Sequence, residues 1–354
     1  MATATKVAQS GRVHTISKSE ARRKLIERVA AVLFSTIAIL WLGANLIKSP
    51  SQFLQATIGG LSNGALYALI ALGYTLVYGI IELINFAHGD LFMLGGVFSA
   101  NFISIWFGQE KSSPKGWLIF LLCLLAVMTF TASINVGIER FAYRRLRRAP
   151  KLAPLITAVG MSFILQFVGL TWNGSGQKSW NSVLPGGAFV VGGAKIYYVT
   201  LILFAVTVPL LLFLTYVVSK TRQGKAMRAT AQDQDAARLM GINVNRTISF
   251  TFALGGALAG AAGLLYVETI GTTAFNLGYQ LGLIAFTAAV LGGIGNLTGA
   301  VLGAVLIGVI QGLNDGLPIG LGQQWSQTVV FSILILLMVF KPAGILGTPT
   351  TEKV

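Results

Sequence analysis

Charged residues and cysteine are scarce in this sequence. Only 10% of its 354 residues are charged, and Cys123 is the single cysteine, so no disulfide framework can form within the chain. No segment matches G-x-x-x-x-G-K-[ST], the phosphate-binding loop of many ATPases, which indicates that this chain does not hydrolyse ATP. Hydrophobic residues make up 54% of the sequence, a share typical of proteins whose solvent is mostly lipid. The composition therefore predicts a polytopic membrane protein.

Apolar runs divide the chain into candidate membrane helices. A helix needs about 20 residues to cross a hydrocarbon core of about 30 Å. Ten runs are candidates, some of them short: 29–47, 53–80, 90–107, 117–138, 154–172, 198–219, 248–268, 281–292, 299–317 and 325–341. We expect an all-α membrane bundle of about 8–10 transmembrane helices, in which the two short runs 281–292 and 299–317 are alternatively a re-entrant pair. The run 29–47 is longer than a signal-peptide core and is interpreted as a retained anchor, with a cleaved signal peptide as the alternative.

The basic residues predict the orientation of these helices. With a cytoplasmic N-terminus and alternating spans, 21 of the 26 basic residues fall on the cytoplasmic side, and five lysines remain outside. This bias follows the positive-inside rule and accounts for the net charge of +15 without a nucleic-acid partner. The predicted organisation is a basic cytoplasmic tail (1–28), a transmembrane domain (29–341) with a long cytoplasmic loop (220–247), and a cytoplasmic C-terminal tail (342–354). The segment 172–197 is then an external loop.

The stretch DAARLMGI (235–242) lies in that cytoplasmic loop. Ala236, Leu239 and Met240 are spaced i, i+3, i+4 and would share one face of a short helix, which Gly241 would close. Such a short helix is marginal alone and needs a surface to pack against. That surface is either the chain's own membrane domain or another protein.

Residues Asp235, Ala236, Ala237 and Gly241 resemble the coupling-loop motif of membrane subunits of ATP-binding-cassette importers, which has an acidic residue, two alanines, three variable residues and glycine. Three longer segments are similar to the permeases for branched-chain amino acids: GALYALIALGYTLVYGIIELINFAHGD (64–90), ERFAYRRLRRAPKLAPLITAVGMSFILQ (139–166) and LIAFTAAVLGGIGNLTGAVLGAVLIG (283–308). The chain departs from the general loop motif, since the isoleucine and Leu-Pro that follow it are missing here. Its N-terminal tail is also longer than expected.

The resemblance implies a permease subunit, and not an enzyme, that moves leucine, isoleucine or valine inward across a bacterial plasma membrane. It implies two cytoplasmic ATPase subunits, a second related permease subunit and an external substrate-binding protein, all working in the lipid bilayer. It assigns ATPase coupling to Asp235, Ala236, Ala237, Arg238, Leu239, Met240 and Gly241. This chain is expected to bind no cofactor, because ATP and Mg²⁺ belong to the ATPase subunits. Urea or other neutral amino acids are alternative substrates, and an ion-coupled secondary transporter or a non-transporting membrane scaffold is the alternative class.

Two polar interruptions are candidate path or gate elements. Asn85, His88 and Gly89 interrupt one apolar stretch, and the segment 292–296, with Gly293, Gly295 and Asn296, interrupts another. Broken helices expose backbone groups, which are tolerated at membrane depth only against protein or a water-filled cavity. The alternative is that both are cytoplasmic turns. A metal ligand or proton relay at His88 is disfavoured because no second membrane His or Cys and no close carboxylate cluster accompanies it.

Other residues receive structural interpretations. The acids Glu82, Asp90, Glu268 and Asp315 lie near predicted span ends and are expected to be interfacial, and Asp90 is a candidate first residue of its helix. A secondary transporter would instead be expected to bury carboxylates in mid-span. Small residues four apart let membrane helices approach closely. Such pairs occur at Gly256 with Gly260 and at Gly299 with Gly303.

Overall fold

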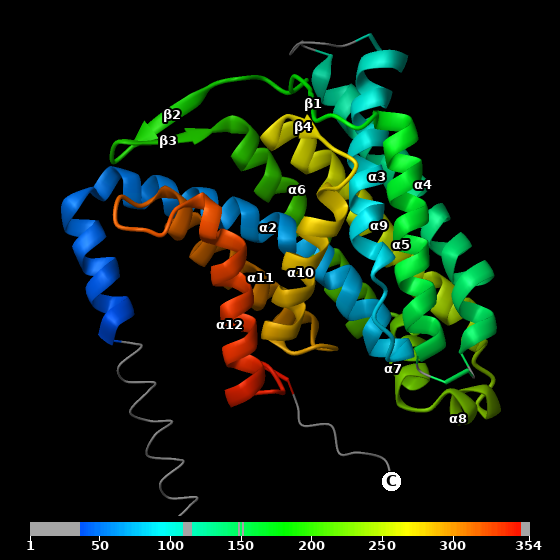
Figure 1. Ribbon diagram of the computed structural model, residues 1–354. Helices are drawn as coiled ribbons and strands as arrows, with labels where there is room; N and C mark the ends of the chain where they lie inside the picture. Colours follow the sequence, from blue (N-terminus) through cyan, green and yellow to red (C-terminus); the bar gives the residue numbers. More distant parts are fainter. Residues whose placement is uncertain (1–35, 109–114, 148, 151, 348–354) are drawn as a thin grey trace, which may run out of the picture. The chain divides into compact units, whose positions relative to one another are not determined.

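The computed structural model describes residues 36–108, 115–147, 149–150 and 152–347 and divides the chain into two units (Figure 1). In the first unit, Met1–Lys48, the described residues form one apolar helix, Thr36–Lys48. This helix covers most of the predicted anchor run, whose residues 29–35 lie outside the described residues, as do the tail 1–28 and most of the C-terminal tail. All the other elements belong to the second unit, Ser49–Val354.

The second unit is almost entirely helical, which confirms the predicted all-α membrane bundle. Eight helices among the described residues are long and apolar enough to cross a membrane, and Thr36–Lys48 and α10 are shorter apolar helices. The helices are α2 (Pro50–Ile81), α3 (Ala87–Asn101), α4 (Gly116–Ile138), α5 (Leu152–Asn173), α6 (Tyr198–Lys220), α7 (Arg222–Gln232), α8 (Gln234–Leu239), α9 (Val244–Ile270), α10 (Leu277–Gly292), α11 (Leu297–Gly316) and α12 (Ser326–Phe340). Short π and 3₁₀ turns extend α3 to Trp106 and α4 to Leu146, and η4 (Gln323–Trp325) leads into α12.

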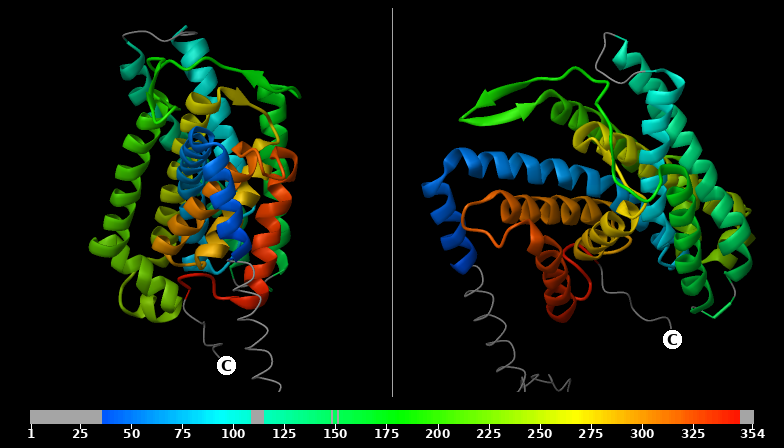
Figure 2. Two further views of the ribbon diagram at one scale, coloured as in Figure 1. Left: turned by 90° about the vertical axis from the view of Figure 1, so that its left-hand side faces the viewer. Right: turned by 45° about the horizontal axis from the view of Figure 1, so that its top comes forward.

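The predicted external loop is structured rather than irregular. Strand β1 (Lys178–Ser179) pairs antiparallel with β4 (Thr272–Thr273), which follows α9. Strands β2 (Ala188–Val191) and β3 (Ala194–Tyr197) form a hairpin that leads directly into α6. Figure 2 shows this hairpin at one end of α6, whereas α7 and α8 follow the other end.

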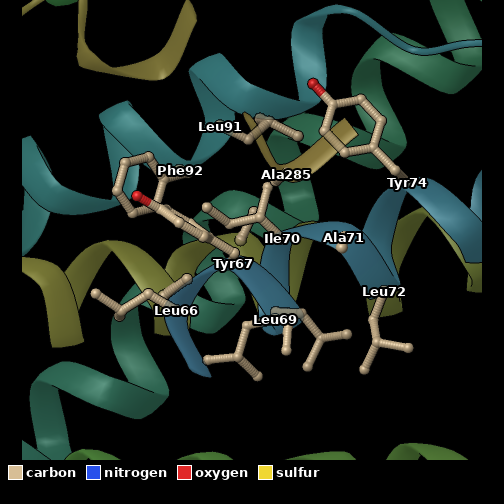
Figure 3. Close-up of a cluster of buried hydrophobic side chains, with 14 of the residues drawn as sticks. Leu66, Tyr67, Leu69, Ile70, Ala71, Leu72, Tyr74, Leu91, Phe92 and Ala285 are labelled. Carbon is tan, nitrogen blue, oxygen red and sulfur yellow. The ribbon is translucent and has the colours of Figure 1, made fainter. Parts of the chain in front are cut away.

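Helices α2, α3, α9 and α10 form the buried centre of the unit. Ile70 of α2 points to the side on which Leu91 and Phe92 of α3 and Ala285 of α10 lie, whereas Leu69 points to the opposite side of α2, and all five belong to one buried cluster (Figure 3). The outward sides of α4, α5, α6 and α12 carry many exposed large apolar side chains. Such a surface suits a protein surrounded by lipid tails.

Glycines set the distances between the central helices. A Cβ at Gly256 would lie 2.7 Å from the Thr131 carbonyl oxygen of α4, and one at Gly260 would lie 2.2 Å from the Thr131 Oγ1. On α11, a Cβ at Gly303 would lie 2.1 Å from the Ala288 carbonyl oxygen, and one at Gly299 would lie 2.3 Å from that of Gly292, so this face lies against α10. At these four predicted positions any larger residue would force the helices apart.

The sequence analysis missed a second set of close glycines, between α2 and α11. A Cβ at Gly60 would lie 2.8 Å from the Gly308 carbonyl oxygen, and a Cβ at Gly312 would lie 2.4 Å from the Gly60 Cα. Gly60 and Gly64 are four residues apart, as are Gly308 and Gly312. The same spacing rule applied to these pairs would have predicted this contact.

Candidate functional site

The loop predicted to be cytoplasmic (220–247) folds into two short helices, α7 and α8. The Asp233 carboxylate caps α8 by accepting hydrogen bonds from the backbone N–H groups of Asp235 (2.8 Å) and Ala236 (3.0 Å). At the other end Gly241 has φ +81°, a left-handed conformation that L side chains rarely adopt. There the Ile242 N–H donates to the Ala237 carbonyl at 3.0 Å, which satisfies an end group of the helix.

Helix α8 and the residue after it expose large apolar side chains. Ala237 is 3% exposed and faces the chain's own domain, whereas Leu239 and Met240 are 89% and 83% exposed. Ala236 is exposed as well, and Asp235 forms an exposed ion pair of 2.7 Å with Arg238. The face that the sequence predicts to be apolar therefore points away from the membrane domain, so its packing surface is not the chain's own bundle.

A buried ion-pair cluster anchors the start of α9, which follows α8. Glu139 is fully buried in the π turn η2 (Glu139–Tyr143) after α4, and it pairs with both Arg144 and Arg147. The Ser249 hydroxyl of α9 donates to the same carboxylate at 2.7 Å, and Arg147 also donates to the Asn245 side chain at 2.8 Å. Burial lowers the pKa of the Arg147 guanidinium, and the negative charge of Glu139 opposes that shift. The sequence analysis treated these arginines only as orientation signals and did not identify the cluster.

The first predicted helix break lies between α2 and α3. Helix α2 ends at Ile81 and is capped by Glu82, which has φ +53°, and α3 begins at Ala87. The expectation that Asp90 begins this helix was wrong, because Asp90 lies within its first turn. Asn85 is buried in the break, and its side-chain oxygen accepts a hydrogen bond of 2.8 Å from the Tyr143 hydroxyl.

His88 occupies the centre of the bundle. Its ring is fully buried and lies edge-on to Tyr74, with the ring centroids 4.8 Å apart. The ring fits because residue 73 is glycine, where a Cβ would lie 2.1 Å from the His88 Nε2 atom. The backbone of Ile70 is close to the ring, yet neither ring nitrogen makes a hydrogen bond of good geometry with a described residue. On the next residue, a Cβ at Gly89 would lie 2.3 Å from the Gly278 carbonyl oxygen of α10.

Asp90 lies deeper in the protein than a span-end position implies. It is fully buried, and its Oδ2 atom accepts a hydrogen bond of 2.5 Å from the Ser162 hydroxyl, which in turn accepts one of 3.0 Å from Gln166. Ser162 lies midway along α5, so the start of α3 faces the middle of a spanning helix. The interfacial expectation was therefore wrong for Asp90. Glu268 lies in the last turn of α9, near a helix end as expected, but its side chain is buried, with 4% exposed. Glu82 and Asp315, by contrast, are exposed.

The second predicted break joins α10 to α11 and is held by the C-terminal segment. Asn296 caps α11 by accepting from the Gly299 N–H at 3.1 Å, and its amide donates to the Leu346 carbonyl at 2.9 Å. Gly293 has φ +106°, and a Cβ there would lie 2.5 Å from the Gly347 nitrogen. Gly295 is exposed at the turn.

The structure brings the two breaks together beside the end of α2. A Cβ at Gly79 would lie 3.7 Å from the Gly295 Cα. A small cavity of about 10 Å³ is lined by Ile84 of the first break, Ile294 of the second break, and Tyr74, Thr75, Tyr78, Phe286 and Ala289. The two interruptions, more than 200 residues apart in the sequence, thus form one region of broken helices. The described residues contain no group of three His, Cys, Asp or Glu side chains that could hold a metal ion.

The sequence of this helical domain matches a known protein family. Residues 56–339 match the protein family described as "Branched-chain amino acid transport system / permease component". The chain belongs to this permease family. It is a multi-pass membrane protein and a component of a transport system.

Curated relatives cover nearly the whole permease. It is 41% identical to the high-affinity branched-chain amino acid transport system permease protein BraD of Pseudomonas aeruginosa over 308 residues, which are 86% of this chain and 98% of the relative. It is 39% identical to the corresponding protein LivH of Escherichia coli K12, over 85% of this chain and 98% of the relative. The galactose/methyl galactoside import permease protein MglC of Haemophilus influenzae is 29% identical over only 44% of this chain and 46% of its own length. No solved structure matches the chain.

Proposed function

We propose that this permease moves branched-chain amino acids inward across a bacterial plasma membrane, driven by ATP hydrolysis on separate subunits that dock at α8. The substrate class is supported by the relatives BraD and LivH, which are described as high-affinity branched-chain amino acid permeases and align over nearly their full length. Urea and other neutral amino acids have no comparable support among these relatives.

The outward-facing Leu239 and Met240 carry the docking part of the proposal. Exposed apolar side chains at a helix tip are stabilised when a partner's groove removes them from water. Ala237 packs on the membrane domain behind them, and the Asp233 cap and Gly241 fix the ends of α8. A preformed, anchored helix loses little conformational freedom on docking, which favours tight binding.

The other partners follow from the arrangement of the chain. It has one α8 segment, so two ATPase subunits require a second permease subunit, either a related chain or another copy. An external substrate-binding protein would deliver the amino acid to the side that carries the β2–β3 hairpin. With α7 and α8 in the cytoplasm, both chain ends are cytoplasmic. ATP and Mg²⁺ would bind the ATPase subunits and not this chain.

The path or gate is proposed to include the two helix breaks. Asn85, His88 and Gly89 lie at the centre of the bundle, and Gly293, Gly295 and Asn296 adjoin them through the cavity at Ile84 and Ile294. A helix that ends inside a bundle can shift its broken end without unfolding the rest of the span. The fully buried His88 and Asp90 would be the groups most affected by such a shift.

The test is isolation of the tagged permease from native membranes in mild detergent, with identification of the proteins that accompany it. We expect two ATPase subunits and a second permease subunit, and uptake of labelled leucine when the purified assembly is reconstituted with its binding protein and ATP. Isolation of the chain alone from well-folded material would contradict the docking proposal. Uptake of other solutes but no leucine would contradict the substrate class.

A further inference from the structure

A cavity of about 210 Å³ lies at the end of α9 that is remote from α8. It is lined by Ser104 at the end of α3, by Ser179, Trp180 and Asn181 of the external loop, by Val267 and Glu268 of α9, and by Ala100 and Ile103. A single water needs about 10–15 Å³ of such space, so the cavity has room for a molecule the size of a small amino acid. Its wall is mixed, with hydroxyl, amide and carboxylate groups beside apolar side chains.

Glu268 places a carboxylate at this cavity. The side chain is 4% exposed, and its Oε2 atom accepts a hydrogen bond of 2.5 Å from the Ser182 hydroxyl. The backbone of Val183 and Leu184 also lies against the carboxylate. These neighbours are dipoles, and no lysine or arginine among the described residues forms an ion pair with Glu268.

Each of the other two buried carboxylates lacks one of the two features of Glu268: Glu139 has a positively charged partner, and Asp90 has no space for a ligand beside it. Glu139 has two arginines, which neutralise it. Asp90 lacks a cation, but it is enclosed between α3, α5 and α10, where a Cβ at Gly278 would already lie 2.8 Å from its Oδ1 atom. Glu268 alone combines a missing counter-charge with an adjoining cavity in the part of the chain that the structure describes. A buried charge without a partner is costly, and a cationic ligand group would remove that cost.

We propose that this cavity is a binding site for the zwitterionic amino acid, with Glu268 pairing with the ligand's ammonium group. The Ser179 hydroxyl and the Asn181 amide supply donors for the ligand carboxylate, whereas the Ser104 hydroxyl donates to the Ala100 carbonyl at 2.8 Å. Ile103 and Val267 offer apolar contact to the ligand's side chain. The Trp180 ring is held in place by a hydrogen bond of 2.7 Å from its Nε1 to Thr273. This inference rests on the proposed function, which supplies an amino acid as the ligand, and it adds how that ligand is recognised on the external side.

Glu268 also holds the external loop through Ser182, and a purely structural role predicts a different outcome. Ser182→Ala removes that hydrogen bond and leaves the charge, whereas Glu268→Gln removes the charge and leaves an acceptor for Ser182. Glu268→Asp restores the charge with a shorter side chain. The three variants therefore separate loop anchoring from charge recognition.

The experiment measures thiol labelling of Ser104→Cys in intact cells that carry the full transporter. Cys123 is fully buried, so the native chain contributes little background. We compare the labelling rates of a cationic and an anionic methanethiosulfonate, 2-aminoethyl and 2-sulfonatoethyl. The cationic-to-anionic rate ratio is expected to be about tenfold higher for Ser104→Cys than for the exposed external control Ser175→Cys, the effect of one nearby unit charge in a partly desolvated site. Leucine should slow the labelling, and 4-methylpentanoate, which lacks the ammonium group, should not.

The ratio should fall to the control value in Glu268→Gln and stay high in Ser182→Ala and Glu268→Asp. An unchanged ratio in Glu268→Gln, an equal fall in Ser182→Ala, or equal protection by 4-methylpentanoate would overturn the proposal. Labelling does not require transport. If wild-type leucine uptake fails while the labelling pattern holds, the proposed function is refuted and the site stands; loss of the pattern with normal uptake refutes the site alone.

Discussion

Truncation of the exposed tip of α8 tests the coupling proposal with a predictable magnitude. In the double variant Leu239→Ala/Met240→Ala, each change removes about three methylene-sized groups, and burial of one such group is worth about 0.8 kcal/mol. If docking buries both side chains completely, the loss is about 4–5 kcal/mol, and since about 1.4 kcal/mol corresponds to a tenfold change, the ATPase should bind about a thousandfold more weakly. The bundle itself should be unaffected, because these side chains are 89% and 83% exposed without the partner.

The affinity of the purified ATPase for the permease in lipid nanodiscs measures this effect directly, and the thermal denaturation midpoint checks the fold. The matched control is Leu239→Ile/Met240→Leu, which keeps apolar volume at both positions and should bind within about tenfold of the wild type, since such swaps usually cost less than about 1.5 kcal/mol. Wild-type affinity in the alanine variant would refute the reasoning. An equal loss in both variants would show that shape at this tip, and not apolar burial, determines binding.

Three further variants test the packing that surrounds the sites. Gly60→Ala places a methyl group 2.8 Å from the backbone of α11 and should destabilise the protein by about 1–3 kcal/mol. The adjacent control Gly59→Ala has no atom within 4 Å of the new methyl group and should not destabilise it. Thermal denaturation in detergent measures the stability of both variants. Gly241→Val forces a β-branched residue to φ +81° and should impair ATP-driven leucine uptake without loss of membrane insertion. Gly241→Asn should retain most of the uptake, because asparagine tolerates a left-handed backbone. Equal uptake in the two variants would contradict the argument. Glu139→Gln leaves two arginines without their buried carboxylate and should lower the free energy of unfolding by about 2–3 kcal/mol. The control Arg140→Gln changes an exposed residue and should lower it by less than about 0.5 kcal/mol. Equal denaturation midpoints for the two variants would refute the role of the cluster.

Helix positions could largely be predicted from the sequence because lipid imposes a minimum apolar length. The predicted run 154–172 corresponds to α5 (Leu152–Asn173), and 198–219 corresponds to α6 (Tyr198–Lys220). The predicted helix ends were wrong where a helix continues through polar residues that are buried by the rest of the protein. Helix α4 was expected to end at residue 138, yet η2 extends it with Glu139, because two arginines neutralise that carboxylate.

The depth and direction of the site residues could not be predicted. The spacing of Ala236, Leu239 and Met240 shows that they share a face, but not whether that face meets the bundle or the cytoplasm. The position of Asp90 depends on Ser162, which is 72 residues away in the sequence, and no local pattern reports that pairing. For the same reason the burial of Glu268 could not be predicted, since Ser182, which donates a hydrogen bond to its carboxylate, lies 86 residues away in the sequence.

Helix α9 physically connects the candidate sites. It begins three residues after Gly241, runs for 27 residues or about 40 Å, and carries Glu268 in its last turn. Along this length it is bound to Glu139 through Ser249, and the Asn135 amide of α4 donates to its Phe252 carbonyl at 2.6 Å. Close-packed interiors resist compression and transmit displacement. Helix α9 packs against α4 at Gly256 and Gly260, where there is no room for even one additional methyl group. A displacement of α8 by a docked ATPase is therefore expected to move α9 together with its neighbours, and so to reach both the buried break at His88 and the cavity at Glu268.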